Sequence, residues 1–254
     1  MDVPAVLVSR VGSDAHGTKL KCWFAESGVN VDLCQSDARH PTGLVEVGIS
    51  PSGAPVYDIR APAAWDFLEA TGDALAAMRQ AGVLVFGTLA QRHPVGRHAV
   101  RSLVEAARAC GVAGLADLNL RAPFYDDEVI FWTLRHCDVL KLNGEELGEV
   151  SRTLGASGSE EDLFVGLLRE FGIARGVLTT GGDGAWIFEE GKLVREPAVA
   201  EVEVLDPVGA GDAFCAALAV GLASGRTLRE SAPRAARAPA AAPAPAALPP
   251  DPCP

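Results

Sequence analysis

Residues 204–224 read VLDPVGAGDAFCAALAVGLAS, and this stretch sets the architecture that the rest of the chain must complete. Pro207 keeps the residues before it extended, while Gly209 and Gly211 remove side chains where a backbone could approach a ligand closely. From about Ala210, apolar residues recur every three to four positions, a spacing that predicts an α-helix. A glycine turn that enters a helix N-terminus aims several unpaired N–H groups at one point, so the stretch predicts an anion-binding site.

Asp212 stands in the first turn of this predicted helix, beside the place where an anion would lie. Such a carboxylate can accept the proton of a hydroxyl group that attacks phosphorus. The residues alone leave an alternative open, because a glycine turn is often only a tight strand-to-helix connection and an acid there often only balances the helix dipole. Neither common phosphate loop fits: Phe214 stands where a dinucleotide fingerprint has its third glycine, and the chain contains no Gly-Lys-Ser or Gly-Lys-Thr.

Composition narrows the class of protein. The 254 residues are 48% hydrophobic, enough for one large α/β domain, and their formal charge of −11 argues against nucleic acid or an anionic membrane surface as a partner. The six cysteines form no C-x-x-C pair, which is typical of reduced thiols rather than a disulfide framework or a zinc site. The sequence shows no signal peptide and no apolar run of membrane-spanning length, so we expect a cytoplasmic protein.

Strand and helix periods alternate along most of the chain. We predict buried strands at residues 5–10, 82–87 and 113–120, and a short strand at 29–33. We predict helices at residues 18–27, 63–79, 95–110 and 127–136. The pattern also predicts two hairpins, one formed by 42–49 and 55–59 and one within 176–193. This alternation predicts a doubly wound, mostly parallel α/β sheet that binds ligands at the carboxyl ends of its strands.

Two predicted strand ends carry polar side chains. Asn119 and Arg121 follow the strand at 113–120; one residue apart on an extended segment, they would point to the same side and meet one ligand, although the arginine could instead pair with a surface acid. Asn143 and Glu146 stand where the next strand gives way to a helix, and an amide oxygen with a carboxylate suits Mg²⁺ held directly or through water. The same two residues match a capping box, and both roles can hold at once.

The nine residues 206–214, DPVGAGDAF, resemble the C-terminal signature of the ribokinase-like (PfkB) carbohydrate kinases. The resemblance implies a ribokinase-like fold and ATP-dependent transfer of the γ-phosphoryl group to a hydroxyl group of a monosaccharide. It implies that the amides of Gly209, Ala210 and Gly211 form the anion hole for the transferred group and that Asp212 is the catalytic base.

Two further motifs match the same family. An Asp-x-Asn-x-Arg-x-x-x-Tyr pattern at residues 117–125 implies that Asn119 and Arg121 line the sugar site. An Asn-x-x-Glu pattern implies that Asn143 and Glu146 help to hold Mg²⁺. The expected partners are therefore a small sugar, ATP and Mg²⁺, with no nucleic acid and no membrane.

The expected nucleotide site uses a third motif, Thr-x-Gly-x-x-Gly. The resemblance implies that Thr179, Gly181 and Gly184 contact ATP, whereas the residues alone would equally predict a plain hairpin turn. Asp206 is a further cofactor-binding candidate, because it could border a monovalent cation beside the anion hole.

The resemblance also implies that strands within about residues 29–60 form a small β lid over the sugar, and such strands could pair between the subunits of a homodimer. Pro41-Thr42-Gly43 and Ala64-Trp65-Asp66 look most like the fructokinase branch, so fructose is the expected sugar. Kinases of 2-keto-3-deoxygluconate or of a nucleoside are the alternatives.

Both ends depart from the family pattern. We expect no counterpart, before residue 5, of the family's first strand with its sugar-binding Asp and Gly-Gly hinge. Beyond residue 231 the composition changes to Ala and Pro, which predicts a disordered tail at 233–254 after a kinase domain at 1–232. A second hypothesis is therefore a truncated or non-catalytic family member that binds a sugar or nucleotide or acts as a scaffold.

Overall fold

The computed structural model describes residues 3–49, 55–198 and 209–241. Its centre is a six-stranded sheet in which the strands from β7 to β10 are parallel, while β11 is antiparallel to both of its neighbours. In spatial order the strands are β12 (Lys192–Glu196), β11 (Ala185–Glu189), β10 (Arg175–Thr179), β9 (Val139–Asn143), β8 (Ala113–Asp117) and β7 (Val83–Gly87). This arrangement confirms the predicted mostly parallel α/β fold.

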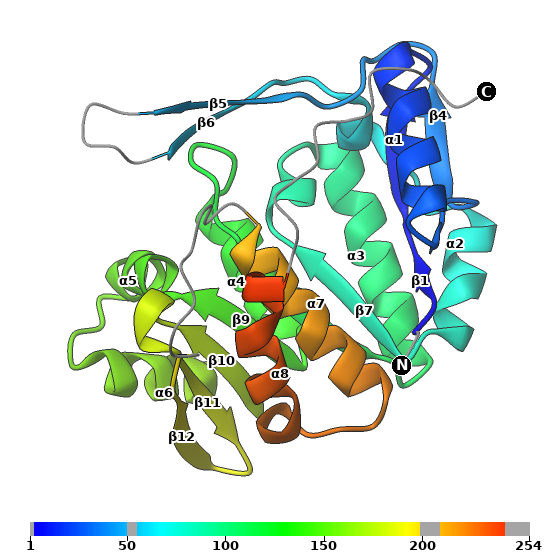
Figure 1. Cartoon of the computed structure of the whole chain (residues 1–254). Coiled ribbons are helices and arrows are strands. Elements are labelled where there is room, and N and C mark those ends of the chain that lie inside the picture. The colour runs from blue at the N-terminus through cyan, green and yellow to red at the C-terminus, as the bar shows by residue number, and fades with distance from the viewer. Residues whose placement is uncertain (1–2, 50–54, 199–208, 242–254) are drawn as a thin grey trace.

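Helices cover both faces of the sheet (Figure 1). One face carries α3 (Pro94–Ala109), α4 (Asp127–His136), α5 (Gly144–Thr153) and α6 (Glu160–Glu170). The other carries α7 (Ala210–Ala223) and α8 (Leu228–Ala241). Neighbouring residues of a strand point to opposite faces, so in β9 Leu140 joins the core under α4, α5 and α6 while Val139 joins the core under α7 and α8.

The helices predicted around α3, α4 and α7 are confirmed, and so are two of their end signals. Gly111 and Gly225 both adopt φ 73° at the second position after α3 and α7, a backbone conformation that glycine adopts with little strain. Helix α4 begins at the predicted residue because the Asp126 side chain accepts a hydrogen bond from the N–H of Val129 at 2.8 Å. In the described residues, none of the helices combines the length and the apolar character needed to cross a membrane.

The predicted single buried strand at residues 5–10 is wrong. The structure has two short strands there, β1 (Ala5–Val6) and β2 (Ser9–Gly12), and neither belongs to the six-stranded sheet. Strand β1 pairs with β3 (Val29–Asn30) and β2 pairs with β4 (Cys34–Asp37), with α1 (Ala15–Glu26) between them. Strand β1 is exposed. The sequence could not show this, because an apolar run indicates a tendency to be buried but not which element will cover it.

The predicted hairpin is confirmed as β5 (Val45–Ile49) paired antiparallel with β6 (Pro55–Ile59), and its turn lies outside the described residues. Figure 1 shows this hairpin extending from the body as an arm. The range of 29–60 expected for the lid begins too early, since β3 and β4 pair with β1 and β2 instead of joining the hairpin.

The helix predicted at 63–79 is also wrong. The segment forms a 3-10 turn at Ala64–Phe67, a break, then α2 (Gly72–Ala77) and a second 3-10 turn at Met78–Gln80. Asp66 anchors the first turn through its ion pair with the distant Arg92. Thr71 starts a new helix, because its hydroxyl accepts the N–H of Ala74. Apolar spacing alone could not show that contact.

The disorder predicted for 233–254 is wrong for its described part, because α8 continues to Ala241 through two prolines. The carboxylate of Glu189 accepts the N–H groups of Leu228 and Arg229 at the start of this helix, at 3.0 and 3.4 Å. Ala232 and Ala235 are fully buried in the core that α7 contributes to, so tertiary packing outweighs the low helix propensity of proline. Residues 242–254 lie outside the described part.

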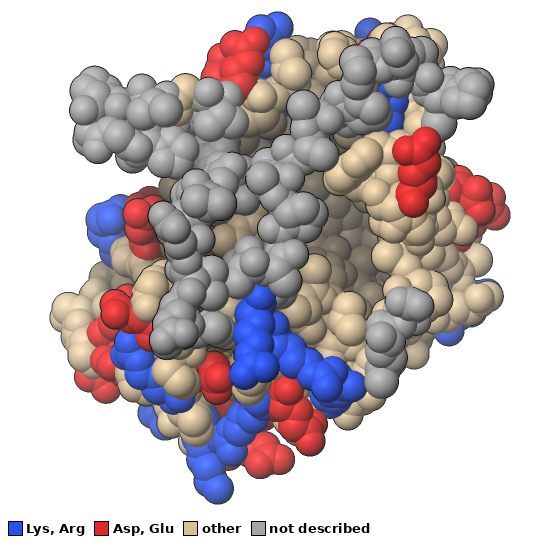
Figure 2. Space-filling view, viewed as in Figure 1, with Lys and Arg blue, Asp and Glu red and all other residues tan. Residues whose placement is uncertain are grey.

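Charge is unevenly distributed over this acidic protein. Figure 2 shows Lys and Arg side chains gathered over the region of α8 and the β11–β12 hairpin, with acidic side chains among them. Helix α8 alone contributes three arginines.

Candidate active site

The N-terminus of α7 has the geometry of an anion site. Gly209 is its N-cap with φ 80°, a left-handed conformation, and no side chain caps the helix there. The first hydrogen bond of the helix runs from the N–H of Ala213 to the carbonyl of Gly209 at 2.8 Å. The amides of Ala210, Gly211 and Asp212 therefore come before the regular hydrogen bonds of the helix. Asp212 is exposed in this first turn. Asp206, the other candidate in this motif, lies outside the described residues.

Beneath this first turn lies a buried ion pair that the sequence analysis did not select. Lys141 Nζ contacts both carboxylate oxygens of Asp117, at 2.9 and 3.0 Å, and the two side chains are only 7% and 11% exposed. A Cβ atom placed on Gly211 would come within 3.2 Å of Lys141 Nζ, so the ammonium group lies against the start of α7. The sequence signal was a lysine among the apolar residues Val139, Leu140 and Leu142 of strand β9.

The charges around this pair influence one another. Burial raises the pKa of Asp117, the adjacent Lys141 opposes that increase, and the negative charge of Asp212 adds to it. Cys215, one turn further along α7, lies close enough to Asp117 for each group to affect the ionisation of the other, and burial raises the pKa of the Cys215 thiol to about 12. These four side chains therefore form one electrostatic cluster under the first turn of α7.

Asn143 and Glu146 form the capping box that the sequence allowed. The Asn143 side chain accepts the N–H of Glu146, and Glu146 Oε2 accepts the N–H of Asn143, both at 2.9 Å. Glu146 Oε1 also accepts the N–H of Leu120 at 2.9 Å, which ties the loop after β8 to the start of α5. Burial raises the pKa of Glu146. Each carboxylate oxygen keeps a second lone pair, so the pair can still hold water molecules of a hydrated ion.

The loop with Asn119 and Arg121 is not extended, which removes the expectation that alternation points both side chains to one side. Strand β8 ends at Asp117, and Asn119 has φ 42°, in the left-handed region that few residues other than glycine adopt. The N–H of Leu118 donates to the Lys141 carbonyl at 3.0 Å, so hydrogen bonds on both sides of Asn119 hold this conformation. Strained backbone at a strand end is typical of ligand-binding sites.

The three residues expected to contact ATP lie at the end of β10 and in the turn that follows it. Thr179 is the register partner of Asn143 on the neighbouring strand. Gly181 and Gly184 have φ 59° and 100°, and a Cβ atom on Gly184 would meet the carbonyl oxygen of Glu196 at 2.2 Å. The end of β12 therefore lies so close to position 184 that only glycine fits there.

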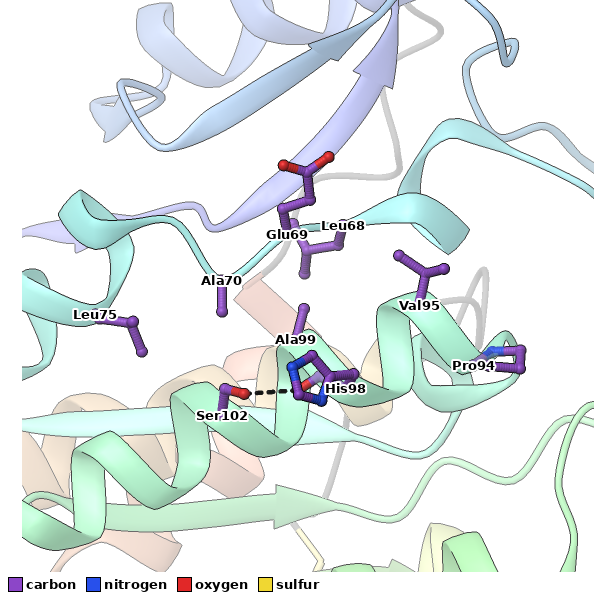
Figure 3. A pocket seen from close by; sticks show the side chains of 9 residues that line it. All are labelled: Leu68, Glu69, Ala70, Leu75, Pro94, Val95, His98, Ala99 and Ser102. Atoms are coloured by element: carbon purple, nitrogen blue, oxygen red, sulfur yellow. Dashed lines mark hydrogen bonds between the residues drawn. The ribbon is translucent and has the colours of Figure 1, made fainter.

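The structure thus brings the candidates from three motifs to one edge of the sheet, where β8, β9 and β10 end. A hollow of about 380 Å³ is lined by residues of the segment after β6, of the start of α3 and of the loop before α4, within 61–66, 92–97 and 123–126. A larger groove of about 630 Å³ lies between α3 and the segment before α2 (Figure 3). The residues that line these two cavities include none of the sequence-predicted candidates. No group of three or more His, Cys, Asp or Glu side chains suited to a metal ion occurs among the described residues.

The fold is that of ribokinase-like proteins. A PfkB protein from Polaromonas sp. JS666 matches with a TM-score of 0.79 and 22% identity, covering 94% of this chain and 79% of that one. Fructokinase with bound ATP from Xylella fastidiosa matches with a TM-score of 0.79 and 23% identity, covering 92% of this chain and 76% of that one.

The chain belongs to the pfkB family of carbohydrate kinases, because the model described as pfkB family carbohydrate kinase matches residues 2–242. Members of this family are phosphotransferases that use an alcohol group as acceptor. Fructokinase from Escherichia coli is 29% identical over 223 residues, covering 85% of this chain and 70% of its own length. Ribokinase from Arabidopsis thaliana is 26% identical, covering 89% and 59%, and aminoimidazole riboside kinase from Salmonella typhimurium is 27% identical, covering 82% and 65%.

Proposed function

We propose that this chain is an ATP-dependent sugar kinase that transfers the γ-phosphoryl group to a hydroxyl group of a monosaccharide, with fructose as the preferred acceptor. The proposal rests on the structure at the start of α7. Gly209 turns the backbone there, and the amides that come before the first hydrogen bond of the helix lie next to the exposed Asp212. The chain spans 70% of the length of the E. coli fructokinase and 59% of that of the Arabidopsis ribokinase.

Each group at the start of α7 has a separate task. Asp212 accepts the proton of the attacking hydroxyl as the bond from its oxygen to phosphorus forms and the bond from phosphorus to the β–γ bridging oxygen breaks. The amides of Gly209, Ala210 and Gly211, with the positive end of the helix dipole, stabilise the charge on the transferred group. ADP leaves with the bridging oxygen.

The nucleotide and its ion are assigned to the edge formed by β9 and β10. Thr179, Gly181 and Gly184 would contact ATP, and Asn143 and Glu146 would hold Mg²⁺ through water, because their own side-chain oxygens already accept backbone N–H groups. When bound, Mg²⁺ neutralises negative charge on the phosphates. The residues of the capping box fit this indirect role.

The sugar is assigned to the loop after β8. Asn119 would donate to and accept from its hydroxyl groups and Arg121 would donate to them, and the 380 Å³ hollow, which is lined in part by the same loop, offers adjacent volume. Fructose is preferred because the fructokinase of E. coli is among the relatives. Ribose and a nucleoside are competing acceptors, since a ribokinase and an aminoimidazole riboside kinase are similar too.

The test is an ADP-release assay with fructose, ribose, 2-keto-3-deoxygluconate and a nucleoside as acceptors. We expect turnover with fructose, and we expect Asp212→Ala to lower kcat by about 10²–10⁴-fold while ATP binding is retained. Asp73→Ala is the matched control, because Asp73 is an exposed acid in the first turn of α2 and has no part in the site. Undiminished turnover by Asp212→Ala removes Asp212 from the role, and binding of sugar and ATP without turnover supports the non-catalytic alternative.

A further inference from the structure

We propose that Lys141 is a further catalytic residue, whose ammonium group contacts the phosphoryl group as it is transferred at the start of α7, and that Asp117 is the residue that positions it. This inference rests on the proposed kinase function and adds a cation to the anion hole.

The apolar surroundings of Lys141 and Asp117 argue against a role that is only structural. Lys141 and Asp117 are register partners on β9 and β8, and the core under α7 that surrounds them is otherwise apolar. That core includes Leu115, Val139, Val177, Phe214 and Leu218, each at most 6% exposed. Removing two charges from water costs about as much as their attraction returns, so a buried pair in such a core adds little stability that apolar side chains would not supply.

The ammonium group retains a donor for a ligand. It has three N–H groups, and the two acceptors that the described residues offer it are the carboxylate oxygens of Asp117. The absence of a side chain at Gly211 leaves Lys141 Nζ directly against the start of α7. The ammonium group is therefore close to the first amides of α7, so an anion held there would lie near both.

The position also explains why a carboxylate accompanies the lysine. Asp117 binds the ammonium group with both oxygens, which fixes a long and otherwise rotatable side chain at one place. A fixed cation in a water-excluded site stabilises charge that develops during phosphoryl transfer without having to reorganise first. The carboxylate also balances the charge of Lys141 when no anion is bound.

The experiment compares Lys141→Met with the double variant Lys141→Met/Asp117→Asn. The single variant leaves a buried carboxylate without its partner, whereas the double variant removes both charges and preserves a neutral, well-packed site. Circular dichroism checks that each variant is folded. Lys192→Met is the control, because Lys192 is exposed on β12.

Two measurements are made on each variant. The first is kcat with fructose and ATP, which we expect to fall by about 10²–10³-fold in the double variant. The second is calorimetric binding of ADP and of a non-hydrolysable ATP analogue. Because Lys141 would face the terminal phosphoryl group, we expect the Kd of the analogue to rise by about tenfold or more while the Kd of ADP stays nearly unchanged.

Asp117→Asn tests the positioning role separately. It keeps the lysine charge but weakens what holds it in place, so we expect kcat to fall by about tenfold while KM for ATP changes little. A change confined to thermal stability would contradict this assignment.

A folded double variant that keeps kcat within about threefold of the original protein overturns the proposal, and so does an equal loss of affinity for ADP and the analogue. If the unaltered protein turns over none of the sugars, the proposed function fails by itself. The comparison of ADP with the analogue then still decides whether Lys141 recognises the terminal phosphoryl group.

Discussion

Arg92 and Asp66 form a two-point ion pair close to the base of the β5–β6 hairpin, with Nε–Oδ1 and Nη2–Oδ2 distances of 2.6 and 2.8 Å. Their side chains are 5% and 2% exposed. The guanidinium group lies over the rings of Trp65 and Phe124, 3.9 and 4.6 Å from their centroids, and also donates to the carbonyl of Arg60 at 2.9 Å. One arginine therefore fastens the segment that follows β6 to the loop that follows β8.

We expect Arg92→Met to lower the free energy of unfolding by about 3–5 kcal/mol, because it leaves the buried Asp66 carboxylate without its partner. Urea denaturation measures this change. The control is Arg152→Met, since Arg152 pairs with Glu149 at the surface and is 72% exposed; we expect a loss of at most about 1 kcal/mol there. Equal, small losses in both variants would show that the buried pair is dispensable for stability.

We expect Gly211→Ala to lower kcat by about tenfold without destabilising the fold. The new Cβ atom would lie 3.2 Å from Lys141 Nζ and displace the ammonium group slightly, while alanine keeps the backbone amide and favours the helix. Gly148→Ala is the matched control, because Gly148 lies within α5 with no atoms near its Cβ position. Unfolding and ADP release are measured for both, and an unchanged kcat in Gly211→Ala would argue against the contact.

Asp37 makes stability depend on pH. Its carboxylate accepts the N–H groups of Arg39 and His40 at 2.7 and 3.1 Å and pairs with Arg10 at 2.9 Å. Burial opposes ionisation, but these donors together hold the pKa of Asp37 well below its usual 3.8. A lowered pKa in the folded state stabilises the protein above the pKa of the unfolded chain, and that contribution disappears as the pH falls towards the folded value.

The comparison is between the unaltered protein and Asp37→Asn, with urea unfolding measured at several pH values from 7 to 3. We expect the difference in free energy of unfolding to be constant above about pH 5 and to shrink progressively below about pH 4. A difference that persists unchanged at pH 3 would show that the charge of Asp37 does not contribute.

Sequence reasoning succeeded where neighbouring residues contain the information. The start of α7 follows from a glycine turn and a regular apolar spacing, and the nine residues 206–214 resemble a family closely enough to indicate the fold. The capping box of Asn143 and Glu146 was readable for the same reason, since both partners lie within one helical turn.

Sequence reasoning failed where contacts between residues distant in the chain decide the structure. The break after Phe67 involves an ion pair to Arg92, and α8 persists because Ala232 and Ala235 pack in one core with strand residues such as Val177 and Ile187. Asn119 adopts its positive φ because Lys141 and Glu146 hold the backbone on either side. None of these partners is near in sequence.

The amino-acid sequence by itself therefore determined the alternation of strands and helices, the glycine turn before α7 and the position of Asp212 in its first turn, because periodicity and turn chemistry act over a few residues. Only the tertiary structure decided that Lys141 and Asp117 meet beneath that turn. Their contact depends on the register of two strands that are separated by an entire helix along the chain.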